Sequence, residues 1–126
     1  MLVGIGADVV DVGRIEKALT RWGERFIERV YTPAERASCR RKANALLYWA
    51  GRFAAKEAVL KALGVGLNGA GFKEVEVLHD AGGRPVVVLK GRAAVAARVL
   101  NVSRVLLTIS HDTGTAVAFA VAERED

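Results

Sequence analysis

The chain has 126 residues, of which 52% are hydrophobic and 26% are charged, and its formal net charge is +5. This length and composition predict one globular domain over residues 1–126 and exclude an intrinsically disordered chain. One cysteine, Cys39, excludes an internal disulfide framework, and with two histidines beside it a Cys/His zinc cluster is disfavoured. No apolar run approaches the ~18 residues of a membrane span, and the start lacks a basic leader, so we expect a cytoplasmic protein.

The positive charge is concentrated in one segment. Residues 13–42 contain nine basic and four acidic residues, so they carry the whole excess of +5, and the rest of the chain is neutral. A nucleic-acid-binding protein would be basic more uniformly, whereas one basic surface indicates one acidic partner. We expect no nucleic-acid partner and no membrane partner.

The first half of the chain predicts one strand followed by helices. Residues 2–10 are rich in Val and Ile, which is typical of a buried strand. Asp11 is the expected N-cap of a helix over residues 12–22, which Gly23 interrupts. Thr32-Pro33-Ala34-Glu35 is a capping box with proline at the first helical position, so a short helix begins there.

The longest predicted helix runs from about Ala45 to Leu63, with Gly64 and Gly66 just beyond its end. After this helix the spacing of apolar residues changes to alternation, which predicts strands, with one further helix among them. We expect strands over 72–78 and 86–90, a helix over 92–100, and strands over 104–110 and 115–122 joined by the turn 111–114. The predicted fold class is α+β, a single domain in which a mainly antiparallel sheet packs with one long helix and shorter helices.

Two carboxylates stand in apolar surroundings. Gly4-Ile5-Gly6 does not continue into a dinucleotide-binding loop, because Val9 occupies the place of the third glycine. Asp8 ends a nearly all-apolar strand, where a charged group must be solvated, paired or bound to a metal; the alternative is a second helix cap beside Asp11.

Glu57 lies on an apolar stripe of the long helix and faces Lys61 one turn on, so the alternative here is an ordinary exposed Glu–Lys pair. Carboxylates without nitrogen or sulfur ligands nearby favour a hard cation such as Mg²⁺. Magnesium beside Lys and Arg side chains indicates a pyrophosphate substrate.

Ser110-His111-Asp112 contains the residue types of a hydrolase triad but cannot form one. Adjacent strand residues face opposite sides, so the three side chains do not converge. His111 either contacts substrate or is a structural turn histidine.

Two segments resemble the paired signatures of the 4′-phosphopantetheinyl transferase family. Residues 6–14 (GADVVDVGR) fit G-x-D followed by R, and residues 53–61 (FAAKEAVLK) fit F-A-x-K-E-A-x-x-K. Gly83-Arg84-Pro85 and Ser110-His111 add support, whereas Thr108 stands where the family often has serine. In order and ~40 residues apart, the two signatures are a specific signal. The chain resembles the family's short, stand-alone bacterial type from end to end.

The resemblance implies transfer of the phosphopantetheine arm of coenzyme A to a serine of an apo acyl carrier protein, which supports fatty acid biosynthesis. It implies that Asp8 and Glu57 bind Mg²⁺, that Lys61 stabilises phosphoryl charge, and that Glu57 or a metal-held water is the base. The weaker candidates for coenzyme A contacts are Arg52, Lys56, Gly64, Pro85 and His111, beside Lys61. It also implies a homotrimer with active sites between subunits.

Four basic residues, Arg14, Lys17, Arg21 and Arg25, would line one stripe of a continuous helix. Carrier proteins are acidic, so we expect this stripe to dock the carrier protein; the alternative is a solvated surface. Two other functions stay open. One is RNA binding, which the neutral charge of the rest of the chain disfavours, and the other is a non-catalytic nucleotide-binding regulator.

Overall fold

The computed structural model describes residues 1–39, 44–66 and 70–125. Its elements in chain order are β1 (Leu2–Asp11), α1 (Val12–Trp22), α2 (Glu24–Val30), α3 (Pro33–Cys39), α4 (Ala45–Ala62), a 3₁₀ turn (Phe72–Glu74), β2 (Val75–His79), β3 (Pro85–Leu89), α5 (Gly91–Val99), β4 (Arg104–His111) and β5 (Thr115–Glu123).

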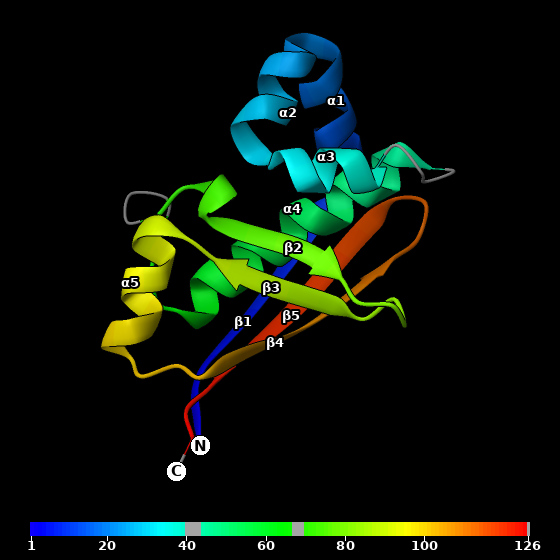
Figure 1. The fold of residues 1–126 in the computed structure, drawn as a ribbon. Helices are drawn as coiled ribbons and strands as arrows, with labels where there is room; N and C mark the ends of the chain where they lie inside the picture. The colour runs from blue at the N-terminus through cyan, green and yellow to red at the C-terminus, as the bar shows by residue number, and fades with distance from the viewer. Residues whose placement is uncertain (40–43, 67–69, 126) are drawn as a thin grey trace.

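The strands form two antiparallel sheets. One has the order β1-β5-β4 and the other is the β2–β3 hairpin. Helix α4 lies across one face of the three-stranded sheet, with the hairpin on its other side, and α1, α2 and α3 gather at the end of the sheet where β1 finishes (Figure 1). The predicted α+β class, with an antiparallel sheet packed against one long helix, is confirmed.

The local signals in the sequence account for most helix ends. Asp11 caps α1 by accepting from the Gly13 N–H, and Gly23 breaks the chain between α1 and α2 at φ 55°. Helix α4 ends in a Schellman motif, in which the Val65 N–H bonds to the Leu60 carbonyl and Gly64 adopts φ 70°. The Asn44 side chain caps the start of α4 by accepting from the Leu47 N–H.

Two elements differ from the sequence prediction. Residues 24–30 form a helix, α2, that was not predicted; its N-cap, Gly23, offers no side-chain acceptor as a signal. The strand expected over 72–78 begins only at Val75, because residues 72–74 form a 3₁₀ turn closed by the Glu74 N–H bonding to the Gly71 carbonyl.

Helix α4 approaches the sheet closely because small residues line the contact. A Cβ added at Gly4 would lie 1.8 Å from the Ala62 carbonyl oxygen, and one added at Gly6 would lie 2.0 Å from the Ala58 carbonyl oxygen. The inward residues of β5 are all fully buried alanines: Ala116, Ala118, Ala120 and Ala122. The two glycines of the β1 segment therefore serve helix packing, not a dinucleotide loop.

The opposite face of the three-stranded sheet is apolar and exposed. Ile5 is 79% exposed on β1, Phe119 is 53% exposed on β5, and Val9 and Leu106 are exposed beside them. Among the described residues, no helix combines the length and hydropathy that crossing a membrane requires. Exposed apolar faces of this kind are typical of surfaces that bind a partner.

Candidate active site

Asp8, Glu57 and Lys61 meet between β1 and α4. The alternation of β1 that turns Gly4 and Gly6 toward α4 turns Asp8 the same way. The Lys61 ammonium donates to the Ala7 carbonyl at 3.0 Å and lies 3.2 Å from Asp8 Oδ1. Asp8 is 16% exposed and Lys61 is 54% exposed, so the pair opens to solvent on the lysine side.

The charges of this cluster act electrostatically on Glu57. Burial raises the pKa of Glu57, and the Asp8 carboxylate raises it further, while Lys61 and Arg14 act in the opposite direction. Two carboxylates that repel each other in a half-buried position form a site that a cation would stabilise. Residues 49 positions apart in sequence (57 − 8) thus form one electrostatic unit.

The donor set fits Mg²⁺ better than other metals. In the described part of the chain, no three His, Cys, Asp or Glu side chains gather closely enough to hold an ion by themselves. Mg²⁺ commonly takes one or two carboxylates and completes its shell with waters and substrate phosphates. Asp8 and Glu57 match this pattern, and Lys61 adds a cationic group for a phosphate oxygen.

A second group of predicted residues lies at a pocket on the β4 side of α4. Arg52 and His111 line this pocket of about 250 Å³, together with Tyr48, Gly51 and Ile109. The Arg52 guanidinium stacks 4.3 Å above the centre of the Tyr48 ring. Within the described residues, Arg52 Nε is buried without a hydrogen-bond partner.

The remaining predicted coenzyme A contacts are dispersed. Gly64 stands at the C-terminal end of α4, where its positive φ gives it a structural reason to be glycine, and Pro85 opens β3. Asp8, Glu57 and Lys61 lie by β1 and the Arg52–His111 pocket lies by β4, on opposite edges of the sheet. A single chain therefore does not bring all the predicted site residues together.

The structure does not support Lys56 as a coenzyme A contact. Its side chain is fully buried, and its ammonium bonds to Glu35 Oε1 at 2.8 Å and to the carbonyls of Val75 and Phe72 at 2.7 and 3.1 Å. An ammonium has three donors, and these three acceptors use all of them. No local pattern indicates this pair, because the capping box at Thr32 and Glu35 already explains the glutamate.

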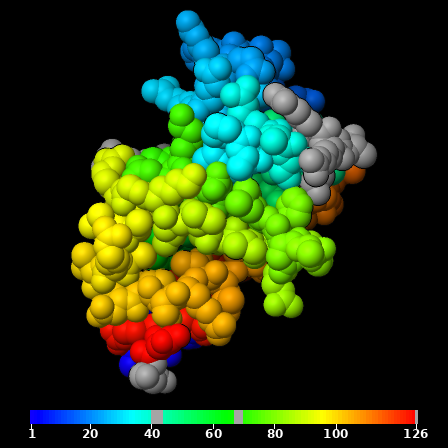
Figure 2. Space-filling view, in the orientation of Figure 1, coloured from blue at the N-terminus to red at the C-terminus, as the bar shows by residue number. Residues whose placement is uncertain are grey.

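The basic stripe is exposed as its spacing predicts. Arg14, Lys17 and Arg21 are exposed on α1, whereas Arg25 lies beyond the break at Gly23, on α2. Arg25 and Arg29 line a groove of about 260 Å³ with Trp22 and Phe26. The helices that carry these residues project at one end of the molecule (Figure 2).

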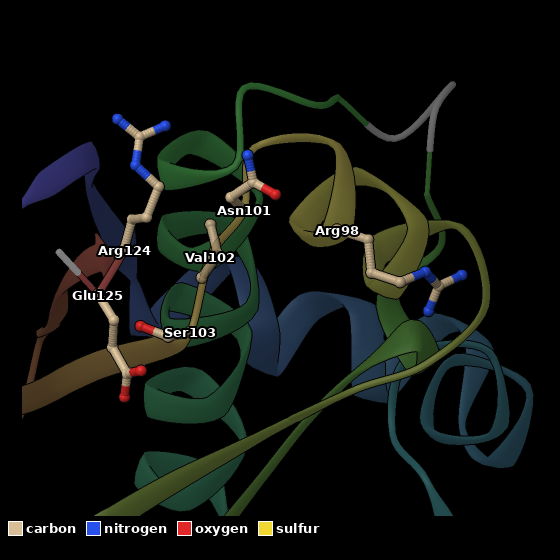
Figure 3. Close-up of a pocket in the computed structure, with 6 residues that line it drawn as sticks. All are labelled: Arg98, Asn101, Val102, Ser103, Arg124 and Glu125. Atoms are coloured by element: carbon tan, nitrogen blue, oxygen red, sulfur yellow. The ribbon is translucent and has the colours of Figure 1, made fainter.

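Another pocket lies at the opposite end of the sheet, near both chain termini. Arg98, Asn101 and Ser103 line it with Arg124 and Glu125 (Figure 3). None of the residues that the sequence predicts for the site lines this pocket. The candidate site is therefore the β1–α4 cluster together with the pocket at Arg52.

Known proteins resemble this chain in both sequence and fold. A family model described as the 4′-phosphopantetheinyl transferase superfamily matches residues 4–120. A holo-[acyl-carrier-protein] synthase of Desulforudis audaxviator is 49% identical over 97% of this chain and 93% of its own length. The crystal structure of the holo-[acyl-carrier-protein] synthase of Neisseria meningitidis superposes with a TM-score of 0.91 at 37% identity, covering 98% of this chain and all of that one.

A Helicobacter pylori holo-[acyl-carrier-protein] synthase solved in complex with coenzyme A has a TM-score of 0.81 at 33% identity, over 94% of this chain and 99% of that one. The chain belongs to the 4′-phosphopantetheinyl transferase superfamily. Within it the chain groups with the holo-[acyl-carrier-protein] synthases and is an enzyme of that group, as the two signatures predicted.

Proposed function

We propose that this enzyme transfers the 4′-phosphopantetheine moiety of coenzyme A to a serine of an apo acyl carrier protein and releases adenosine 3′,5′-bisphosphate. The reaction depends on Mg²⁺, takes place in the cytoplasm and supports fatty acid biosynthesis. The observation that carries the proposal is the cluster of Asp8, Glu57 and Lys61, because two carboxylates and an exposed ammonium suit a magnesium pyrophosphate.

The side chains divide the chemistry between them. Asp8 and Glu57 would hold Mg²⁺, which when bound neutralises charge on the pyrophosphate oxygens. The serine oxygen bonds to the phosphorus that carries the pantetheine, and the bond from that phosphorus to the bridging oxygen breaks. The bridging oxygen leaves with adenosine 3′,5′-bisphosphate. Glu57, or a water held by the metal, would accept the serine proton.

The pocket at Arg52 and His111 would take another part of coenzyme A. The Arg52 guanidinium charge and the exposed His111 imidazole suit a phosphate or a polar edge of the nucleotide. This pocket and the Asp8 cluster lie at opposite edges of one sheet. A homotrimer in which one protomer supplies the β1 edge and its neighbour the β4 edge would complete the site, and the exposed Ile5 and Phe119 face supplies apolar surface for the contact.

An assay with coenzyme A and apo carrier protein tests the proposal. Mass spectrometry should show the carrier protein gaining one phosphopantetheine in the presence of Mg²⁺ and none in the presence of a chelator. Addition that is unaffected by chelation would contradict the metal-dependent mechanism. Binding of coenzyme A without any transfer would favour the regulator.

Lys61 should contribute to the rate and little to stability. Lys61→Ala is expected to lower kcat about 10²- to 10³-fold, as removal of one preorganised electrostatic group does. If Lys61 is only the exposed partner of Asp8, the variant would lose less than ~1 kcal/mol of stability and keep its rate. Steady-state kinetics with thermal unfolding separates the two, with Lys73→Ala as the control for loss of an exposed lysine.

Charge reversal on α1 should weaken carrier-protein docking selectively. Arg14 also acts electrostatically on Glu57, so Arg21 gives the cleaner test. Arg21→Glu is expected to raise the KM for carrier protein about tenfold, or about 1.4 kcal/mol, and to leave the KM for coenzyme A unchanged. Added salt should raise the same KM in the parent enzyme. The matched control is Arg98→Glu on α5. If Arg21→Glu and Arg98→Glu changed the KM for carrier protein equally, the basic stripe on α1 would be only a solvated surface.

A further inference from the structure

A buried polar network joins α3, α4 and the hairpin on the side of α4 that faces the hairpin. The Glu35 and Lys56 side chains are both 0% exposed and form an ion pair. Besides Lys56, Glu35 accepts from the backbone N–H groups of Thr32 and Val77, each at 2.8 Å. Glu76, itself buried, accepts from the Thr32 hydroxyl and pairs with Lys90 at 3.3 Å.

The ion pair is fully satisfied. Glu35 receives three hydrogen bonds and Lys56 donates three, so neither charge is left without partners. Burial lowers the pKa of Lys56, and the adjacent Glu35 carboxylate opposes that shift. Replacing a buried ion pair by well-packed apolar side chains is often neutral or stabilising, so stability alone gives weak grounds for an ion pair here.

Lys56 and Glu57 are adjacent on α4 and therefore point about 100° apart around the helix. On the β1 side, besides the hydrogen bond from the half-exposed Lys61 ammonium to the Ala7 carbonyl, α4 rests on Gly4 and Gly6 through van der Waals contact. Such contact limits how closely the helix approaches but has little directional preference. On the hairpin side, the three directional bonds of Lys56 tie α4 to the Glu35 carboxylate of α3 and to the backbone carbonyls of Phe72 and Val75.

We propose that the Glu35–Lys56 pair is a positioning pair, which orients α4 so that Glu57 on this helix faces Asp8 on β1. Neither residue touches substrate; both act through the helix that carries Glu57 and Lys61. The inference rests on the proposed magnesium site at Asp8 and Glu57. It assigns a catalytic purpose to a buried charge pair that stands apart from that site.

The test uses variants that differ in whether a buried charge is left unpaired. Lys56→Met alone leaves the buried Glu35 carboxylate without its cationic partner, so we expect this variant to unfold at a lower temperature. The double variant Glu35→Gln with Lys56→Met leaves no unpaired charge, so it should regain most of the lost stability. We nevertheless expect the folded double variant to keep a 10- to 100-fold lower kcat, to need several-fold more Mg²⁺ for half-maximal activity, and to retain the parent KM for carrier protein.

A second readout does not depend on the metal or on activity. In metal-free protein with ¹³C-labelled alanine methyl groups, the resonances of Ala58 and Ala62 report on the contact of α4 with Gly6 and Gly4. We expect both to shift in the double variant. They should stay in place in Val30→Ala, a control cavity at the end of α2.

The outcomes separate the two proposals. A double variant with parent kcat, parent Mg²⁺ requirement and unmoved alanine resonances would make the pair purely structural and overturn the inference. Shifted resonances together with a parent enzyme that ignores Mg²⁺ would overturn the proposed magnesium mechanism and, with it, the purpose assigned to the pair. The helix-orienting effect itself would then stand.

Discussion

Replacing either Asp8 or Glu57 by alanine is expected to lower transfer by at least about 10³-fold while the chain stays folded. Both carboxylates are partly accessible and sit at the edge of the core, so their loss removes charge from the metal site but leaves packing intact. The measurement is phosphopantetheine transfer at saturating coenzyme A, with circular dichroism to verify the fold. Glu125→Ala, an exposed carboxylate near the chain termini, is the matched control.

The raised pKa of Glu57 adds a pH dependence with a defined sign. Without metal, ionisation of Glu57 costs stability, so this contribution improves as pH falls through the raised pKa. Mg²⁺ binds the ionised form, so stabilisation by Mg²⁺ should fade over the same interval as protons compete. Melting temperatures with and without Mg²⁺ should therefore converge on acidification, and Glu57→Gln should remove most of the difference. A Mg²⁺ effect that is the same at all pH values would contradict this assignment.

The second large effect is expected at Gly6, although this residue carries no chemistry. Gly6→Ala places a Cβ 2.0 Å from the Ala58 carbonyl oxygen, which belongs to helix backbone and cannot rotate away. We expect a destabilisation above the ~1–3 kcal/mol of ordinary over-packing. The molecules that remain folded should lose transfer activity, because α4 must move away from Asp8.

Chemical denaturation and transfer assays on Gly6→Ala measure both effects. Gly66→Ala is the matched control, because a Cβ there meets no atom of the described residues within 4 Å. Equal stability of the two variants would show that α4 can retreat from β1 at little cost. The close approach would then not position the site.

The sequence predicted the elements well where an end signal is local. Asp11, the box at Thr32, and Gly64 each act within a few residues, and each marks a helix boundary in the structure. Helix α2 lacks such a signal, since its N-cap is a glycine without a side-chain acceptor. Short helices of this kind are stabilised by tertiary contacts, such as Phe26 stacking on Phe53, which no local pattern contains.

The site was predictable to the extent that the two signatures place functional side chains. Asp8, Glu57 and Lys61 stand in those signatures, and the structure brings them together. Lys56 stands in the same signature but points about 100° away from Glu57, into the core. Its partner Glu35 is 21 residues distant, and pairing over that distance depends on how α3 and α4 pack, which spacing along the chain does not specify.

The buried alanines of β5 limit the substitutions that the contact between β5 and α4 can accept. Alanine has no side-chain rotamers, so burying it costs no side-chain entropy on folding, unlike leucine or methionine. The layer between β5 and α4 is built from such residues, including Ala54, Ala58, Ala118 and Ala120, all fully buried. The close approach of the α4 and β5 backbones keeps this layer ordered. Its side chains therefore have few alternative conformations, and larger side chains do not fit. Sequence drift in this layer should be confined to exchanges among the smallest residues.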